Sequence, residues 1–153
     1  MEPPDVVLLD SGPLGLVSHP NAEKVNAEAV GWLEALLSAG VSVLVAEIAD
    51  CEVRRELLRA GRQRGVQRLD ELKEAIGYRP ITTRAMLTAA GLWADARKQG
   101  QPTAPDPALD ADVILAAQAR DVESEAQRVI VATTNPHHLS RFVEAKAWQE
   151  IEP

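Results

Sequence analysis

Acidic residues in three separate parts of the chain are placed where they could hold a metal ion. Asp10 directly follows the apolar run 6–9, while Glu52 and Asp112 lie in two different helical stretches. Hard divalent cations prefer oxygen ligands, and carboxylates brought close together repel one another until a cation neutralises them. A metal held by them could activate water, orient a phosphodiester and stabilise the departing oxygen. The three acids are therefore the candidate catalytic and metal-binding residues.

Asp112 has the most unusual surroundings of the three. Apolar residues lie almost all the way round its helical stretch, a pattern typical of a buried helix. Asp112 falls between Ala116 and Ala119, and a buried carboxylate is costly unless it is paired or bound to metal. The plainer interpretation is a first-turn acid favoured by the helix dipole, which is compatible with metal binding. Asp110 is a candidate supporting group, and Asp106 is a weaker substitute.

Glu52 has two rivals in its own stretch. Glu47 points to the opposite side of the helix, whereas Glu56 shares a face with Glu52. Glu56 lies a full turn, about 5–6 Å, further from the start of the helix. We therefore choose Glu52 as the ligand, with Glu56 as a possible outer partner. The alternative is that all three are ordinary solvated glutamates.

Alternating strands and helices must position these acids. Apolar runs predict strands, and residues of helical periodicity separate them. The expected strands are 6–9, 41–45 and 129–132, with an extended piece at 80–81, a short edge strand at 148–151 and a turn at 10–13; the expected helices are 21–39, 47–60, 67–76, 83–98 and 109–119, with a loop at 101–107. This order predicts one α/β domain over residues 1–153, with three α/β/α layers around a central parallel sheet.

The carboxyl edge of such a sheet is the expected place of the site. Ligands of doubly wound sheets gather there, and Asp10 follows the first strand. Thr133 and Asn135 follow the third strand, so they should share that edge. The amide oxygen of Asn135 can ligate a hard cation, which makes it the fourth candidate metal ligand.

Positive charge is concentrated in the middle of an acidic chain. The chain carries a net charge of −7, yet residues 54–98 hold eleven bases against five acids. Arginine forks suit phosphate recognition, so Arg55, Arg59 and Arg62 are candidate RNA-binding residues. A solvated helix surface and a docking surface for an acidic partner protein are the alternatives.

Other kinds of site find little support. The single Cys51 excludes an internal disulfide and a cysteine metal cluster, which suits a cytoplasmic protein. No signal peptide and no apolar run of membrane-spanning length is present. His137 and His138 are adjacent and lack the partners that zinc needs, and the chain has no phosphate-binding loop, dinucleotide fingerprint or nucleophile elbow.

Five segments together resemble the PIN-domain ribonucleases, most closely the VapC-type toxins and related bacterial stand-alone PIN proteins. Residues 7–11 resemble the family's apolar strand ending in Asp then Ser or Thr, and 46–57 resembles the segment with its Glu. Residues 81–100 are similar to the helix before the active-site loop. The strongest match is 112–119, which resembles Asp-x-x-Ile-Ala-Ala-x-Ala, and 131–135 resembles a strand ending in Thr-x-Asp or Thr-x-Asn.

The resemblance implies an endoribonuclease that uses Mg²⁺ or Mn²⁺ bound by Asp10, Glu52 and Asp112. It also implies that Ser11 and Thr133 support these carboxylates. RNA is then the substrate, an antitoxin protein is a possible partner, and a homodimer is expected. One departure is Asn135, which stands where many family members have a fourth acid.

Two other function classes compete with this one. A non-catalytic PIN-like module could bind RNA or a protein partner, and the neutral Asn135 favours that view. A phosphatase or receiver-like domain is weaker, because no acidic pair with a distal Lys follows the required strands.

Overall fold

The computed structural model describes residues 2–21, 23–100, 106–125 and 128–153. The expected loop 101–107 thus lies mostly outside the described residues. In chain order the elements are β1 (Val6–Leu9), α1 (Ser11–Ser18), α2 (Lys24–Ser38), β2 (Ser42–Ala46), α3 (Glu47–Arg59), α4 (Gln63–Ala75), β3 (Gly77–Arg79), α5 (Thr83–Lys98), α6 (Asp106–Glu123), β4 (Val129–Thr133), α7 (Pro136–Leu139), β5 (Ala145–Ala147) and a final 3-10 turn (Trp148–Glu150).

All five strands run parallel in one sheet, in the order β3-β2-β1-β4-β5. Every residue of β1 and β4 is buried, which explains why their sequences are continuously apolar rather than alternating. Leu9 is level with Val45 of β2 and Ala132 of β4, so the three strands end side by side. The predicted α/β fold with a central parallel sheet is confirmed.

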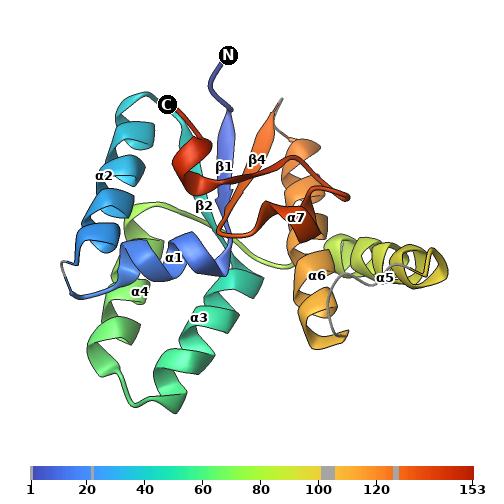
Figure 1. The fold of residues 1–153 in the computed structure, drawn as a ribbon, viewed down its shortest axis with the longest axis horizontal. Coiled ribbons are helices and arrows are strands. Elements are labelled where there is room, and N and C mark those ends of the chain that lie inside the picture. The colour runs from blue at the N-terminus through green and yellow to red at the C-terminus, as the bar shows by residue number, and fades with distance from the viewer. Residues whose placement is uncertain (1, 22, 101–105, 126–127) are drawn as a thin grey trace.

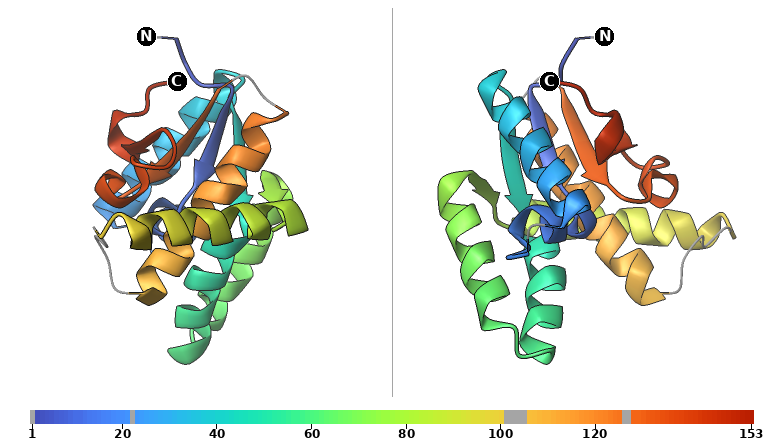
Figure 2. Two further views of the ribbon diagram at one scale, coloured as in Figure 1. Left: turned by 90° about the vertical axis from the view of Figure 1, so that its right-hand side faces the viewer. Right: turned by 60° about the vertical axis from the view of Figure 1, so that its left-hand side comes forward.

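Helices cover both faces of this sheet. Helices α2 and α6 lie on opposite faces, as the two views of Figure 2 show. Leu33 and Leu36 of α2 and Leu115 and Ala119 of α6 all belong to the main apolar core. Helix α5 packs across α6 and extends away from the sheet (Figure 1), and a second apolar cluster forms between these two helices.

Two local predictions were wrong, and a third was displaced along the chain. Residues 10–13 do not form a turn: helix α1 starts at Ser11, because the Asp10 side chain caps it and Pro13 in the first turn needs no backbone donor. The extended piece expected around 80–81 lies slightly earlier in the chain, as strand β3 at 77–79. The strand expected at 148–151 is instead β5 followed by the 3-10 turn, where buried Trp148 packs edge-on against Trp32, with ring centroids 5.5 Å apart.

Candidate metal centre

Asp10 is held in place at the carboxyl end of β1 by two hydrogen bonds. The Ser11 backbone N–H donates to Oδ1 at 2.7 Å, and the Thr133 hydroxyl donates to Oδ2 at 2.8 Å. Thr133 is buried at the end of β4, and its oxygen also accepts from the Asn135 backbone N–H at 3.1 Å. Asp10 therefore joins the ends of two neighbouring strands, and Ser11 and Thr133 lie where their supporting role was expected.

A close approach of α1 to the end of β4 allows this arrangement. A Cβ built on Gly12 would lie 2.5 Å from Thr134 Cγ2 and 2.8 Å from its hydroxyl oxygen. Real Cβ atoms do not come that near, so any side chain at position 12 would force α1 or Thr134 to shift. Glycine thus keeps the first turn of α1, and with it Ser11, against the strand that carries Thr133.

Glu52 and Asp112 lie close enough to Asp10 for their charges to interact. Burial first, and then the charges of Asp10 and Asp112, raise the pKa of Glu52 to about 7 against the opposing charge of Arg55. Burial, then the charge of Asp10, raises the pKa of Asp112 to about 6. Burial also raises the pKa of Asp10, although the hydrogen bonds from Thr133 and Ser11 oppose it. Three elements, β1, α3 and α6, thus bring the predicted acids together.

The position of Asp112 in its helix differs from expectation. Helix α6 begins at Asp106, so Asp112 is the seventh helical residue and lies beyond the first turn. Stabilisation by the helix dipole fades within the first turn, and it does not explain this carboxylate. The raised pKa shows instead that Asp112 is costly to keep charged in the metal-free protein.

The donor atoms suit a hard divalent cation, although they do not form a closed cage. Within the described residues, no group of three His, Cys, Asp or Glu side chains is already spaced to enclose an ion. Mg²⁺ commonly takes only one or two carboxylates and fills its other positions with water or phosphate. Burial raises the pKa of all three carboxylates, and the charge of Asp10 adds to this at Glu52 and Asp112; such a group, at an edge partly open to solvent, fits that mode of binding.

Cationic side chains border the acids on two sides. Arg55 lies 4.0 Å from the Glu52 carboxylate. His138 and Arg141, from α7 and the residues after it, lower the pKa of Asp112 by their charge. Sequence reasoning missed these two, because a loop histidine and an isolated arginine carry no pattern. Their place just after the third predicted strand was the one available signal.

The remaining predicted residues have varied surroundings. Glu47 is neither solvated nor part of the site: it accepts hydrogen bonds from the Tyr78 hydroxyl and the Ile81 backbone N–H, both at 2.8 Å. Glu56 pairs with Arg59 at 2.7 Å on the exposed face of α3. Asp110 is exposed on α6, Asn135 is exposed where β4 ends beside Asp10, and the side chain of Asp106 lies outside the described part.

Gln118 ties together the helices that carry Glu52 and Asp112. Its side chain is fully buried, its Oε1 accepts from the Ile48 backbone N–H at 3.3 Å, and its Nε2 donates to the Arg79 carbonyl at 2.8 Å. These bonds fix α6 against the first turn of α3 and against β3. Nothing in the sequence marks Gln118 as buried, since its partners are backbone groups 70 and 39 residues away.

Comparison with solved structures identifies the fold. A chain of VapBC2 from Rickettsia felis bound to a promoter DNA fragment superposes with a TM-score of 0.71 at 13% identity, covering 94% of this chain and 98% of that one. VapBC-1 from nontypeable Haemophilus influenzae gives a TM-score of 0.67 at 17% identity, over 95% and 99% of the two chains. DNA-bound VapBC from Salmonella typhimurium gives 0.59 at 15%, over 93% and 97%. The protein has a VapC-like PIN fold. No protein-family model and no curated protein matches the sequence.

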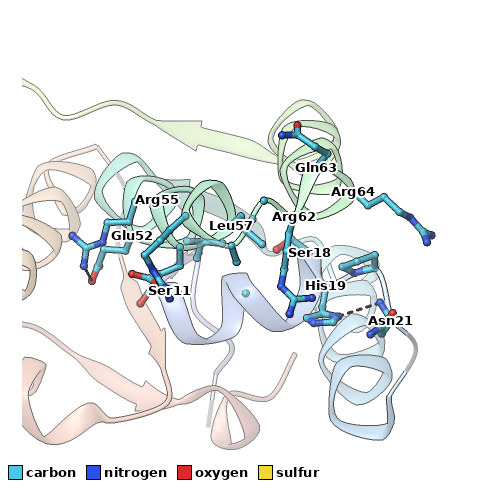
Figure 3. Close-up of a pocket in the computed structure, with 18 of the residues that line it drawn as sticks. Ser11, Ser18, His19, Asn21, Glu52, Arg55, Leu57, Arg62, Gln63 and Arg64 are labelled. Carbon is cyan, nitrogen blue, oxygen red and sulfur yellow. Dashed lines mark hydrogen bonds and ion pairs between the residues drawn. The ribbon is translucent and has the colours of Figure 1, made fainter.

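The PIN-like fold carries a groove beside its acidic edge. The groove has a volume of 1010 Å³, begins at Ser11 and Glu52, and runs between α1 and α3 to the turn into α4 (Figure 3). All three predicted RNA-binding arginines, Arg55, Arg59 and Arg62, line it. Among the described helices, none is both long and apolar enough to cross a membrane.

Proposed function

We propose that this protein is a Mg²⁺- or Mn²⁺-dependent endoribonuclease that hydrolyses RNA phosphodiester bonds at Asp10, Glu52 and Asp112. The observation that carries the proposal is electrostatic. Burial raises the pKa of all three carboxylates, and the charge of Asp10 raises the pKa of Glu52 and of Asp112 as well, so the protein keeps these acids close together at a cost. A divalent cation relieves that cost, and a structural role does not explain it.

Each side chain of the site has a separate role in this proposal. Asp10, Glu52 and Asp112 would hold the cation, with Asn135 as a possible fourth oxygen donor. Ser11 and Thr133 fix the Asp10 carboxylate, so that its orientation does not change when substrate arrives. Arg55 lies beside Glu52, where its guanidinium can bind a phosphate oxygen. The bound cation would supply activation of the attacking water and stabilisation of the leaving oxygen.

Cleavage of a mixed RNA sample tests this proposal directly. The parent protein should cut RNA internally in Mg²⁺ or Mn²⁺, should leave 5′-phosphate and 3′-hydroxyl ends, and should be inactive in EDTA. Activity that survives EDTA, or its absence in both metals, would refute the assignment.

We extend the proposal to a toxin-like protein with an antitoxin partner. The solved structures with this fold are described as VapBC, two of them bound to DNA, and the likeness covers nearly the whole chain. RNA, an antitoxin and a second copy of the chain are the proposed partners, and the cytoplasm is the proposed location.

A second candidate function is a PIN-like module that binds RNA or a protein without cutting it. Two observations favour it: no three acids of the described chain are spaced to enclose an ion, and the fourth position of the edge is the neutral Asn135. RNA binding without metal-dependent cleavage would identify this function.

Exchange of Asn135 for Asp should strengthen metal binding. Asn135 follows β4 at the acidic edge, and its backbone N–H is hydrogen-bonded to the Thr133 oxygen that supports Asp10. An added carboxylate there increases attraction for a cation and repulsion among the acids. Asn135→Asp should therefore bind Mn²⁺ about tenfold more tightly, a difference of about 1.4 kcal/mol, and unfold at a lower temperature in EDTA.

Calorimetric titration with Mn²⁺ and thermal unfolding in EDTA measure the two halves of this prediction. Ser140→Asp, an exposed site beyond α7, is a control for added charge. Equal Mn²⁺ affinity in Asn135→Asp and the parent would make Asn135 a structural residue and leave the three acids as the site.

A further inference from the structure

The far end of the groove lies at the turn between α3 and α4, and it carries the guanidinium of Arg62. Arg62 follows Gly61, whose left-handed φ of 67° turns the chain from α3 into α4. Figure 3 shows the Arg62 side chain directed from this turn across the groove toward Ser18 and His19 of the opposite wall. Arg62 thus faces the groove and not the surrounding solvent alone.

Arg62 differs in its pairing from Arg55 and Arg59 of the same groove, and it shares the lack of a carboxylate partner among the described residues with Arg64, which also lines the groove. Arg59 is hydrogen-bonded to Glu56, and Arg55 lies beside Glu52. In the described part of the chain, no carboxylate pairs with Arg62. His19 next to it accepts a hydrogen bond at Nδ1 from the Asn21 backbone N–H, so a neutral ring carries its proton on Nε2. This end of the groove therefore offers the donors of Arg62 and His19 without a carboxylate paired to them.

The α1 wall of the groove has a glycine, without a side chain, between the two ends. Gly15 lies in the middle of α1, lines the groove, and would place a Cβ in open space with no atom within 4 Å. Glycine inside a helix is less favourable than alanine. Packing within the protein does not require glycine at this position, and its lack of a side chain leaves room for a molecule in the groove.

The length of the groove suits a short single strand. Helix α3 runs seven residues beyond Glu52 to Arg59, which is roughly 10 Å or roughly three nucleotides of a stacked strand, and the turn that carries Arg62 follows. The acids at one end need a cation to receive a phosphate, whereas Arg62 and His19 can bind one directly.

We propose that the groove between α1 and α3 binds the single-stranded RNA next to the cleaved bond, with a distal phosphate held by Arg62 and His19. The identity of the ligand rests on the proposed function. The strand passes over Gly15, where a side chain would block it. The distal site contributes to affinity and to the length of RNA required, and it does not touch the reacting atoms.

Binding of a labelled single-stranded oligouridine of twelve nucleotides tests this site in EDTA, where no cleavage occurs. Arg62→Gln should bind three- to tenfold more weakly and should reduce the slope of log affinity against log salt by about 0.7, the value for one lost phosphate contact on a single strand. Arg68→Gln is the matched control, because Arg68 is exposed on α4 outside the groove, and its affinity should stay within twofold of the parent.

A second pair of variants tests the path of the strand. Gly15→Leu should weaken binding by at least tenfold. Gly31→Leu should leave it unchanged, since Gly31 also lies inside a helix with open space around it, but on α2 outside the groove. Circular dichroism and thermal unfolding establish that each variant folds. If Gly15→Leu does not fold, Gly15→Ala and the Arg62 pair decide the question.

Three results would overturn the inference: no binding of the oligonucleotide by the parent at low salt, equal losses in Arg62→Gln and Arg68→Gln, or full affinity in Gly15→Leu. The first would leave a protein segment as the occupant of the groove. All three results are measured in EDTA, so they do not depend on cleavage. A parent protein that binds through the groove and never cleaves would instead refute the proposed nuclease function alone.

Discussion

Replacing Asp10 or Asp112 with Asn is expected to lower kcat/KM for RNA cleavage by more than about 100-fold while the fold survives. Loss of groups that merely orient metal ligands costs about 10- to 100-fold, so loss of a ligand should cost more. Both carboxylates lie at the carboxyl edge of the sheet, where their charges interact. Cleavage of a labelled RNA in Mg²⁺, measured over a range of enzyme concentrations, gives the rate.

The substitution Asp112→Asn should also make the metal-free protein more stable at high pH. The pKa of Asp112 is about 6 in the folded protein and 3.8 as the ordinary value, so folding disfavours its charged form. The resulting destabilisation is absent below pH 4, grows as the pH rises through 6, and is complete above that. Asp112→Asn should therefore raise the free energy of unfolding by on the order of 1 kcal/mol at pH 8 in EDTA, after allowance for solvent screening, and by little at pH 4.

Opposite signs for activity and stability distinguish a metal ligand from a structural acid. Asp5→Asn is a suitable control, because Asp5 is exposed at the other end of β1 and carries the same charge. If Asp10→Asn and Asp112→Asn cleave RNA as fast as the parent, the proposed site is in the wrong place. If Asp112→Asn is less stable than the parent at pH 8, the carboxylate is a structural group.

Removal of the Asp121 side chain should lower the free energy of unfolding more than any other substitution proposed for this protein. Asp121 is 6% exposed and accepts hydrogen bonds from the Thr82 hydroxyl at 2.9 Å, Arg84 Nε at 2.8 Å and Arg79 Nη2 at 3.1 Å. Arg79 Nε is already buried with no partner among the described residues. Without Asp121 its guanidinium would lose a buried counter-charge, which costs about 3–5 kcal/mol. Urea unfolding of Asp121→Ala at pH 7 measures the difference.

Acid should reproduce part of this effect in the parent protein. Burial alone would raise the pKa of Asp121, but the bonds from Thr82, Arg84 and Arg79 outweigh it and hold the pKa below the ordinary 3.8. Its contribution to stability is therefore complete above pH 4 and is lost as the pH falls through the folded-state value. The difference between parent and Asp121→Ala should shrink toward pH 2.

Glu125→Gln provides the comparison for Asp121→Ala. Glu125 also pairs with Arg79, at 2.9 Å, but its side chain is exposed, so its loss should change stability little. A loss in Asp121→Ala no greater than in Glu125→Gln would show that the buried network does not hold α5, α6 and β3 together.

Local apolar pattern was enough to predict most of the sheet and the edge where the acids meet. Residues 6–9 and 129–132 are continuously apolar because strands buried on both faces must be, and that property is visible in any short window. Once parallel strands are inferred, the polar residues that directly follow them must lie at the carboxyl edge of the sheet. Asp10 and Thr133 could therefore be placed together although 123 residues separate them.

Helix α1 was not predicted, because its first residues form a local pattern that is typical of a turn. Asp-Ser-Gly-Pro is typical of a turn when read alone, whereas in the folded protein Asp10 caps a helix that packs against the end of β4. The Asp10 cap starts the helix and the close fit of Gly12 lets it pack against Thr134, and this packing exists only after the strands have assembled.

The amino-acid sequence by itself determined the layered α/β fold, the parallel sheet and the three acids at its edge, because these follow from periodicity and chain order. Only the tertiary structure decided which carboxylates serve which purpose. Glu47, Asp121 and Glu52 are alike in sequence terms, but the first two are satisfied by hydrogen bonds from distant parts of the chain, and Glu52 is left with a pKa of about 7 beside Asp10. Hydrogen-bond partners and burial set the energy of a charge, and both depend on residues far away in the sequence.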